Sequence, residues 1–304
     1  MRTPLAALAS LAAAAALLGG CGAEPSADSD AGSSPSGSAS GTSSAAPAKP
    51  SASASAQALD DASVPLAERL SVAMKTVADG TPGSTEVREA ALFEQTSARD
   101  LAKAPRSEAD QVCSELSAAD RTQLDADLDA ARELSAMTDP QPKLPDWRIL
   151  TPPKPDALRP LYRKAQQETG TPWQYLAAVH LVETRMGRIR GTSTAGAQGP
   201  MQFLPSTFAQ YGAGGDINDP ADAIMAAGRM LASNGAPGDM SSALWSYNHS
   251  DRYVAAVSAY AEQMKRSAAA YDLYWHWQVL YRHQDGTMLL PEGYPGKKAV
   301  RISD

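Results

Sequence analysis

The chain has 304 residues with 34 acidic and 27 basic side chains, and its formal net charge is −7. No basic stripe runs along it, which argues against nucleic acid as a partner. The acids gather early: residues 60–139 hold seventeen acidic and eight basic side chains, whereas residues 140–304 are slightly basic. A chain of this length can bury one sizeable core with additions to it.

The first twenty residues have the features of an export signal. Arg2 supplies a positive charge, and Leu5 to Leu18 form an apolar stretch that is too short for a stable membrane span. The segment 18–21, Leu-Gly-Gly-Cys, resembles the lipobox of bacterial lipoproteins, in which the cysteine is acylated and becomes the new N-terminus. The resemblance implies a lipoprotein signal peptide over 1–20, lipidation of Cys21 and export to the outer face of the cytoplasmic membrane. An unlipidated signal peptide is the alternative.

Residues 21–138 fall into two segments, the first with the composition of a linker and the second with that of helices. Ser, Ala, Gly and Pro dominate residues 21–62, which predicts a disordered tether. Residues 63–138 are rich in Ala, Leu, Glu and Arg, and we expect an arm of helices that packs on, or spaces, the catalytic part; a binding module is the alternative. Breaks at 80–83 and at Pro105 predict three helices, over 65–78, 86–104 and 106–137. Cys113 has no disulfide partner in the mature chain, and we interpret it as a small buried hydrophobe.

The second half of the chain reads as mainly helical. A proline-rich crossing over 139–160 is expected to be extended, and ordered only where Trp147 or Ile149 docks. Helical signals resume at Leu161 and continue almost to Tyr281. Asp285-Gly286 lies between apolar runs and predicts a hairpin. The fold class is therefore mainly α with a small C-terminal hairpin.

Glu183 lies on the most informative of these predicted helices. Thr171 is suited to cap its N-terminus, Pro172 suits the first helical position, and Gly187 is placed to end it. At about 100° per residue Glu183 points away from the polar side of the helix. A carboxyl group there is paired with a cation such as Arg188 or Arg190, or it is a general acid with a raised pKa. The helix alone favours neither interpretation.

Two motifs downstream favour the general acid. Gly191, Gly196 and Gly199 lie within nine residues, a density that lets backbone approach a ligand closely, and Pro200 is expected to open a short helix. Tyr247-Asn248 follows near the start of the last helix. A tyrosine ring and an amide are suited to bind an acetamido sugar.

With Glu183, the run from Ser193 to Gln202 and the Tyr247-Asn248 pair resemble the lytic transglycosylases with the goose-type-lysozyme fold. The spacing is similar to the soluble (SLT) branch, and "VETRMG", "QFLPSTF" and "YNHSDRYV" look like membrane-bound lytic transglycosylase B. The resemblance covers about residues 157–265. It implies a lysozyme-like helical domain, placed at 139–268, that acts on peptidoglycan glycan strands.

The resemblance also implies the roles of the site residues. Glu183 matches the catalytic acid/base. The expected substrate contacts are the residues that match the family's cleft, namely Ser193, Met201, Gln202, Tyr247 and Asn248. Two departures stand out: Pro200 replaces the usual leucine, and a short loop with Asp216, Asn218 and Asp219 replaces a longer loop that holds calcium in the B branch. We expect no metal and no cofactor.

The loop 184–202 contains no carboxylate to serve as a second catalytic acid. This absence favours catalysis by Glu183 alone, and the resemblance then implies cleavage of the β-1,4 MurNAc–GlcNAc bond with a 1,6-anhydromuramyl product. A hydrolytic goose-type muramidase stays an alternative through Asp216, Asp219 or Asp222, and a non-catalytic peptidoglycan-binding lipoprotein is another. His180, on the Glu183 helix, is interpreted as a core histidine.

An aromatic extension, residues 269–304, lies outside the resemblance. It holds Tyr271, Tyr274, Trp275, Trp277 and Tyr281, whose spacing fits either a helix or a strand. The first interpretation is that these rings clamp the C-terminal segment onto the core. The second is that Trp275 or Trp277 faces the cleft and stacks on a sugar.

Overall fold

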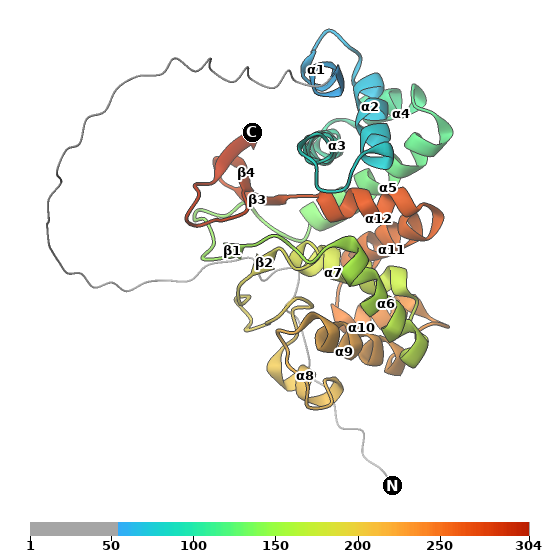
Figure 1. Ribbon diagram of the computed structural model, residues 1–304, viewed down its shortest axis with the longest axis vertical. Helices are drawn as coiled ribbons and strands as arrows, with labels where there is room; N and C mark the ends of the chain where they lie inside the picture. Colours follow the sequence, from blue (N-terminus) through green and yellow to red (C-terminus); the bar gives the residue numbers. More distant parts are fainter. Residues whose placement is uncertain (1–53, 304) are drawn as a thin grey trace, which may run out of the picture.

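An arm of five helices forms one end of the molecule (Figure 1). The computed structural model describes residues 54–303; Cys21 and the signal segment lie outside them. The helices of the arm are α1 (Ala54–Asp60), α2 (Leu66–Asp79), α3 (Thr85–Lys103), α4 (Arg106–Ser114) and α5 (Ala118–Ser135). The arm does not stand apart, because α5 packs along α11 (Asp251–Arg266) of the next part of the chain.

The arm differs from the sequence-based expectation in two places. The segment assigned to the disordered tether contains α1, whose Leu59 is buried in the main core. The single helix expected over 106–137 is two helices, because the Ser117 hydroxyl accepts a hydrogen bond from the Asp120 N–H and starts α5 anew. Cys113 is buried in the small core of the arm, as expected, and burial raises the pKa of its thiol to about 11.

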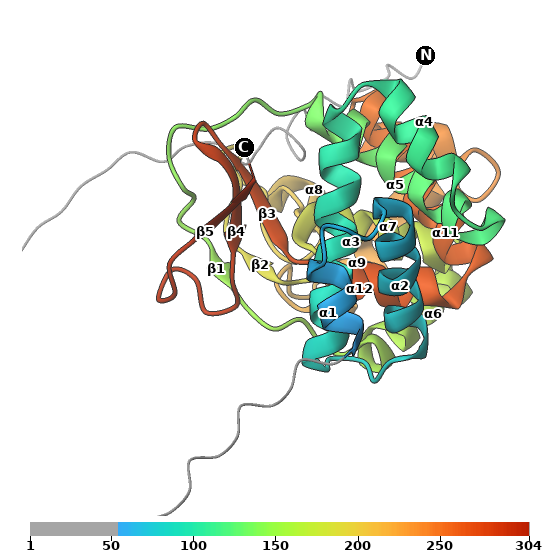
Figure 2. The same cartoon turned by 90° about the horizontal axis from the view of Figure 1, so that it is seen from above.

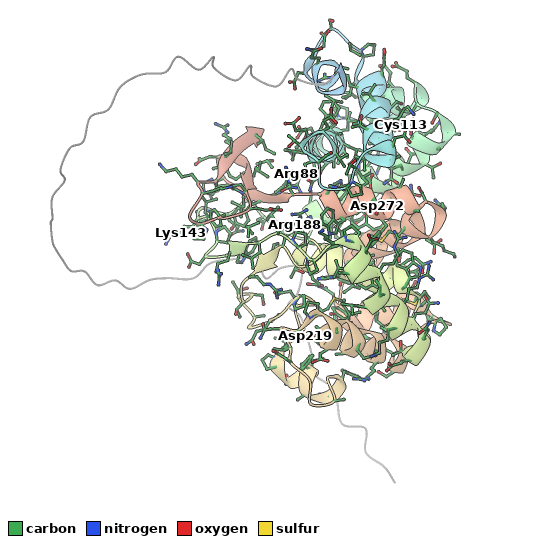
Figure 3. The ribbon with its side chains drawn as sticks, viewed as in Figure 1. Arg88, Cys113, Lys143, Arg188, Asp219 and Asp272 are labelled. Carbon is green, nitrogen blue, oxygen red and sulfur yellow. The ribbon has the colours of Figure 1, made fainter. Side chains whose placement is uncertain are left out.

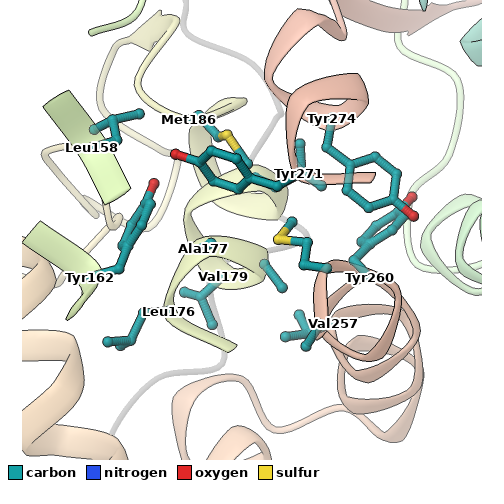
Figure 4. Close-up of a cluster of buried hydrophobic side chains, with 14 of the residues drawn as sticks. Leu158, Tyr162, Leu176, Ala177, Val179, Met186, Val257, Tyr260, Tyr271 and Tyr274 are labelled. Atoms are coloured by element: carbon teal, nitrogen blue, oxygen red, sulfur yellow. The ribbon is translucent and has the colours of Figure 1, made fainter. Parts of the chain in front are cut away.

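Helix α7 lies at the centre of the second part of the molecule. Its apolar side chains meet α6, α9 and α11, so it is buried on nearly all sides (Figure 4). The helices of this part are α6 (Pro155–Thr169), α7 (Trp173–Thr184), α8 (Pro205–Tyr211), α9 (Pro220–Ser233), α10 (Met240–Tyr247) and α11. Two expectations are corrected. The short helix opens at Pro205 rather than Pro200, and α7 begins after Pro172, because the Thr171 hydroxyl donates to the Gly228 carbonyl instead of capping it.

The crossing and the C-terminal extension meet beside the helices (Figure 2). Strand β1 (Arg148–Ile149) pairs antiparallel with β2 (Ile189–Arg190), and Trp147 and Ile149 are buried, as expected. After α12 (Ala268–His276) the predicted hairpin is present as β3 (Val279–His283) and β4 (Gly286–Leu290). A third strand, β5 (Val300–Ser303), pairs with β4 and was not predicted.

The aromatic extension is helical up to His276 and a strand from Val279, and Trp277 lies between the two elements. The five rings that gave rise to the two interpretations, those of Tyr271, Tyr274, Trp275, Trp277 and Tyr281, are all buried. The Trp275 indole N–H donates to the Pro153 carbonyl and that of Trp277 to the Glu94 carboxylate. These contacts support the clamp. In the part of the chain seen here, no helix combines the length and apolar character needed to cross a bilayer.

Candidate active site

The turn after α7 sets the direction of Glu183. The helix ends at Thr184, and Arg185, Met186 and Gly187 all take left-handed backbone angles, with φ of 53°, 56° and 90°. The helix was expected to run to Gly187, so it ends earlier than predicted. The Thr184 hydroxyl donates to the Pro200 carbonyl at 2.6 Å and accepts from the Gly187 N–H, which ties the turn to the following loop. Strained non-glycine residues of this kind are typical of functional sites.

Glu183 is buried with one hydrogen-bond partner of its own. Its side chain is 7 % exposed. Its Oε1 accepts a hydrogen bond from the Tyr253 hydroxyl group, with 2.7 Å between the two oxygen atoms. Burial raises the pKa of the carboxyl group to about 8, and the Tyr253 hydrogen bond offsets only part of that rise. Glu183 is therefore protonated at neutral pH and can act as a general acid.

The two arginines that could have formed an ion pair with Glu183 have other partners. Arg188, in the middle of Figure 3, pairs with Glu292 and donates to the Trp275 carbonyl. Arg190 donates to the Asn218 carbonyl. His180 is fully buried, shares a hydrogen bond with the Tyr162 hydroxyl through its Nδ1, and has a pKa lowered to about 3 by burial. Within residues 54–303, Glu183 therefore forms no ion pair with a cation, and His180 is a neutral core residue.

Beside the turn that follows α7, the backbone of the glycine-rich loop packs closely against the backbone at Ile217. A Cβ atom on Gly199 would lie 1.9 Å from the Ile217 carbonyl oxygen, and the φ of this residue is +73°. Only glycine fits there without a shift of the loop. Gln202, three residues on, also has a left-handed backbone, and its side-chain amide donates to the Gly199 carbonyl at 3.0 Å.

Tyr253 and Tyr247 link this loop to Glu183 from the opposite side. The two rings stack, with centroids 6.4 Å apart, and the Tyr247 hydroxyl donates to the Met201 carbonyl at 2.6 Å. Sequence reasoning missed Tyr253, although it lies in the "YNHSDRYV" segment that carries the resemblance. The signal was only its position on α11, six residues after Tyr247.

Most of the expected substrate contacts are buried supports in this structure. Met201 is fully buried, and Tyr247 and Asn248 are about 95 % buried. The Ser193 hydroxyl accepts the Ala197 N–H inside the loop. Gln202 alone among them lines the same pocket as Glu183. For the other four residues, direct contact with the substrate stays a prediction.

The pocket beside Glu183 has a volume of about 130 Å³, and two of its walls come from outside the family-like segment. The arm contributes α3 and α5, and the C-terminal extension contributes Trp277 and β3. Trp147 of the crossing closes another side. The second interpretation of the extension placed Trp275 or Trp277 at the cleft, and Trp277 does line this pocket. The arm carried no catalytic motif in the sequence, so its part in the site was not predicted.

The three aspartates that were the basis for the hydrolytic alternative lie outside the pocket of Glu183. Asp216 is bonded within its own loop, and Asp219 caps α9, in a different region from Arg188 (Figure 3). Neither they nor Asp222 line the pocket of Glu183. Two acids that were not predicted do line it: Asp127, which is buried, and Asp139, which is exposed.

Comparison with known proteins gives this geometry a family. Residues 160–269 match the family model described as the transglycosylase SLT domain. Neither a curated protein nor a solved structure matches the chain. The matched segment runs from α6 to the start of α12 and contains Glu183, the glycine loop and Tyr253. Over residues 160–269 the chain therefore carries the lysozyme-like transglycosylase SLT domain of the peptidoglycan lytic transglycosylases, enzymes that cleave the bacterial wall polymer.

Proposed function

We propose that the enzyme cleaves the β-1,4 bond between MurNAc and GlcNAc with Glu183 as its only acid/base and forms a 1,6-anhydromuramyl end. One observation carries the proposal. The Glu183 carboxyl group is buried at a pocket, is held by the Tyr253 hydroxyl, and has a pKa of about 8. It enters the reaction as an acid that is protonated at neutral pH.

The reaction needs one proton to leave Glu183 and one to return. Protonated Glu183 gives its proton to the glycosidic oxygen as the C1–O bond breaks, and the GlcNAc residue leaves with a free 4-hydroxyl group. The neighbouring 2-acetamido group stabilises the cationic C1. Ionised Glu183 then takes the proton of the muramyl C6 hydroxyl, whose oxygen bonds to C1. The carboxyl group is restored and no water is consumed.

Tyr253 is the positioning residue in this scheme. Its hydroxyl group donates to Glu183 Oε1, so the other carboxyl oxygen can face the substrate. The hydrogen bond is strongest when Glu183 is ionised. It therefore stabilises the carboxylate that forms as the glycosidic bond breaks.

Hydrolysis is the second candidate, and a specific observation supports it. Asp127 and Asp139 line the same pocket as Glu183, and a two-carboxylate hydrolase needs a second acid there. Asp127 is an unsuitable base, because it already accepts hydrogen bonds from Tyr274 and Gln123. Asp139 is exposed at the rim and is the residue through which water would be activated.

Digestion of purified sacculi separates these reactions. Anhydromuramyl ends, measured by mass, are expected from the parent protein and from Asp139→Asn. Reducing ends that disappear in Asp139→Asn would establish hydrolysis instead. Strand binding without released fragments would identify a non-catalytic wall protein. In all cases Glu183→Gln is expected to keep the fold and lose cleavage, since general acid/base catalysis contributes about 10²–10⁴ in rate.

We also propose that the enzyme is exported and anchored through a lipid on Cys21 to the outer face of the cytoplasmic membrane. The lipobox-like segment 18–21 supports this proposal. Cys21→Ser is expected to release the protein from the membrane fraction without changing its cleavage of isolated sacculi. A Cys21→Ser protein that stays with the membrane would contradict lipid anchoring.

A further inference from the structure

Three arginines line the pocket beside Glu183, and each comes from a different part of the chain. Arg99 lies on α3 of the arm, Arg185 lies in the turn after α7, and Arg282 lies on β3 of the extension. Each is partly exposed, so their side chains reach the space of the pocket. Only Arg185 belongs to the transglycosylase domain.

None of the three guanidinium groups forms an ion pair within residues 54–303. Arg185 donates to the Leu181 carbonyl, and Arg282 donates to the carbonyls of Ser135 and Thr138. The Nε of Arg99 is buried without a hydrogen-bond partner. Burial and the nearby charges of Arg185 and Arg282 lower the pKa of Arg99 to about 10, so the three cations lie close enough to repel one another.

The acids nearby have other surroundings or partners. Asp127 is hydrogen-bonded to Tyr274 and Gln123, and burial raises its pKa to about 7. Asp139 is exposed, and Asp100 pairs with Lys103. Three guanidinium groups that form no ion pair within residues 54–303 are costly in a pocket whose other walls include Trp147 and Val279. A bound anion would remove that cost.

The size and chemistry of the pocket suit a carboxylate. A cavity of about 150 Å³ holds a benzene molecule, so about 130 Å³ has room for a substituent of about six heavy atoms. Arginine presents a planar fork that binds carboxylates through two hydrogen bonds.

We propose that Arg99, Arg185 and Arg282 bind a carboxylate on the muramyl side of the glycan strand, so that the arm and the extension select the substrate of the transglycosylase domain. This inference rests on the proposed function. The carboxylate has two possible sources. In strands stripped of their stem peptides it is the free lactyl carboxylate, and in intact strands it is a carboxylate of the stem peptide.

Equilibrium binding to the purified Glu183→Gln protein tests the inference without any need for cleavage. Three substrates are compared: stem-bearing strands, stripped strands, and stripped strands whose lactyl carboxylates are capped as methylamides. We expect one of the two charged forms to bind with a Kd about tenfold lower than that of the capped form. This factor corresponds to the free energy of one charge-assisted hydrogen bond. The form that does so, stripped or stem-bearing, identifies the source.

Arg99→Gln in the same background is expected to remove most of this tenfold preference and to leave binding of the capped strands unchanged. Arg99→Lys keeps the charge without the planar fork and is expected to be intermediate. Arg88→Gln is the matched control, because Arg88 lies exposed on the same helix (Figure 3). Melting temperatures of all the variants show that each is folded.

Two results would overturn the inference and leave the proposed function intact. One is equal affinity for charged and capped strands. The other is a preference that Arg99→Gln retains as fully as Arg88→Gln does. Failure to bind any of the three strands would contradict the proposed function itself, and the inference would fall with it.

Discussion

A carboxylic acid donates a proton only while it holds one, and burial keeps the Glu183 proton in place up to about pH 8. We therefore expect turnover on sacculi to fall as the pH rises through 8. In Tyr253→Phe the hydroxyl that lowers the pKa is gone, so the alkaline limb of the profile should move to higher pH. Its kcat should also fall about tenfold, the size of one lost hydrogen bond to a charged group.

The control for this pH profile is Tyr211→Phe, which removes a tyrosine hydroxyl on α8 that accepts a hydrogen bond from Ser233. Its profile should match that of the parent. An unmoved alkaline limb in Tyr253→Phe would show that this hydroxyl does not set the protonation of Glu183.

Gly199 offers a second test at the residue scale. Alanine there has a left-handed φ, which costs about 1–2 kcal/mol, and its Cβ also meets the Ile217 carbonyl. Gly196→Ala shares the left-handed φ of +85° but meets no atom within 4 Å. We expect Gly199→Ala to have the lower melting temperature of the two and to lose more activity, because Gln202 is bonded to Gly199. Equal effects would show that the contact with Ile217 imposes no constraint.

For single residues, the sequence predicted which way a side chain points better than it predicted the partners that the side chain contacts. The helical phase of Glu183 correctly predicted an inward carboxyl group, because that phase depends only on local geometry. The hydrogen bonds of Tyr253 and Tyr247 depend on how α10 and α11 meet the loop 191–204. No local pattern carries that information.

At the scale of elements, α3 and α5 share a buried pair of acids. Glu94 and Asp127 are both fully buried, with Trp277 donating to the first and Tyr274 to the second. Burial raises both pKa values, that of Asp127 to about 7 from an ordinary 3.8. Because the folded state holds the proton of such an acid more tightly than the unfolded state does, protonation favours folding. This contribution to the free energy of unfolding is complete below about pH 4 and is lost as the pH rises through 7.

We therefore expect the melting temperature to fall by about 5 °C between pH 5 and pH 8. Asp127→Asn cannot lose a proton, so its slope over this window should be shallower. Asp129→Asn, an exposed change on the same helix, should keep the slope of the parent. The titration of Glu183 is common to all three proteins and cancels in the comparison. Equal slopes for the two variants would exclude Asp127 as the source.

Helix and strand types were predictable where propensity and capping agree, and boundaries were not. The break between α4 and α5 depends on a single serine cap, which the continuous run of Ala and Leu concealed. The strand β5 has no periodic signal of its own, and its pairing with β4 is a long-range contact. In the extension, one aromatic run spans the end of the helix and the start of the strand, so its spacing could not locate the boundary between them.

At the scale of the whole molecule, the transglycosylase domain is not a separate body. Its helix α11 packs along α5 of the arm, and α12 of the extension packs on α2 and α3 (Figure 1). The predicted division at 138 and 268 follows changes of composition, whereas the core is continuous across both points. Composition marks where the chain changes character, and it does not report which surfaces are buried together.

Deletion of residues 270–304 tests this unity. It removes Trp277 and Tyr274, the hydrogen-bond partners of Glu94 and Asp127, and it removes Tyr271 from the core around α7 (Figure 4). Buried acids left without partners destabilise a fold strongly, so we expect the truncated protein to melt well below the parent and to lose cleavage. Deletion of residues 296–304 removes β5 but keeps α12, β3 and β4, and should have a much smaller effect on the melting temperature. A protein that lacks residues 270–304 and still matches the parent in melting temperature and in cleavage of sacculi would show that the transglycosylase domain folds and acts without its extension.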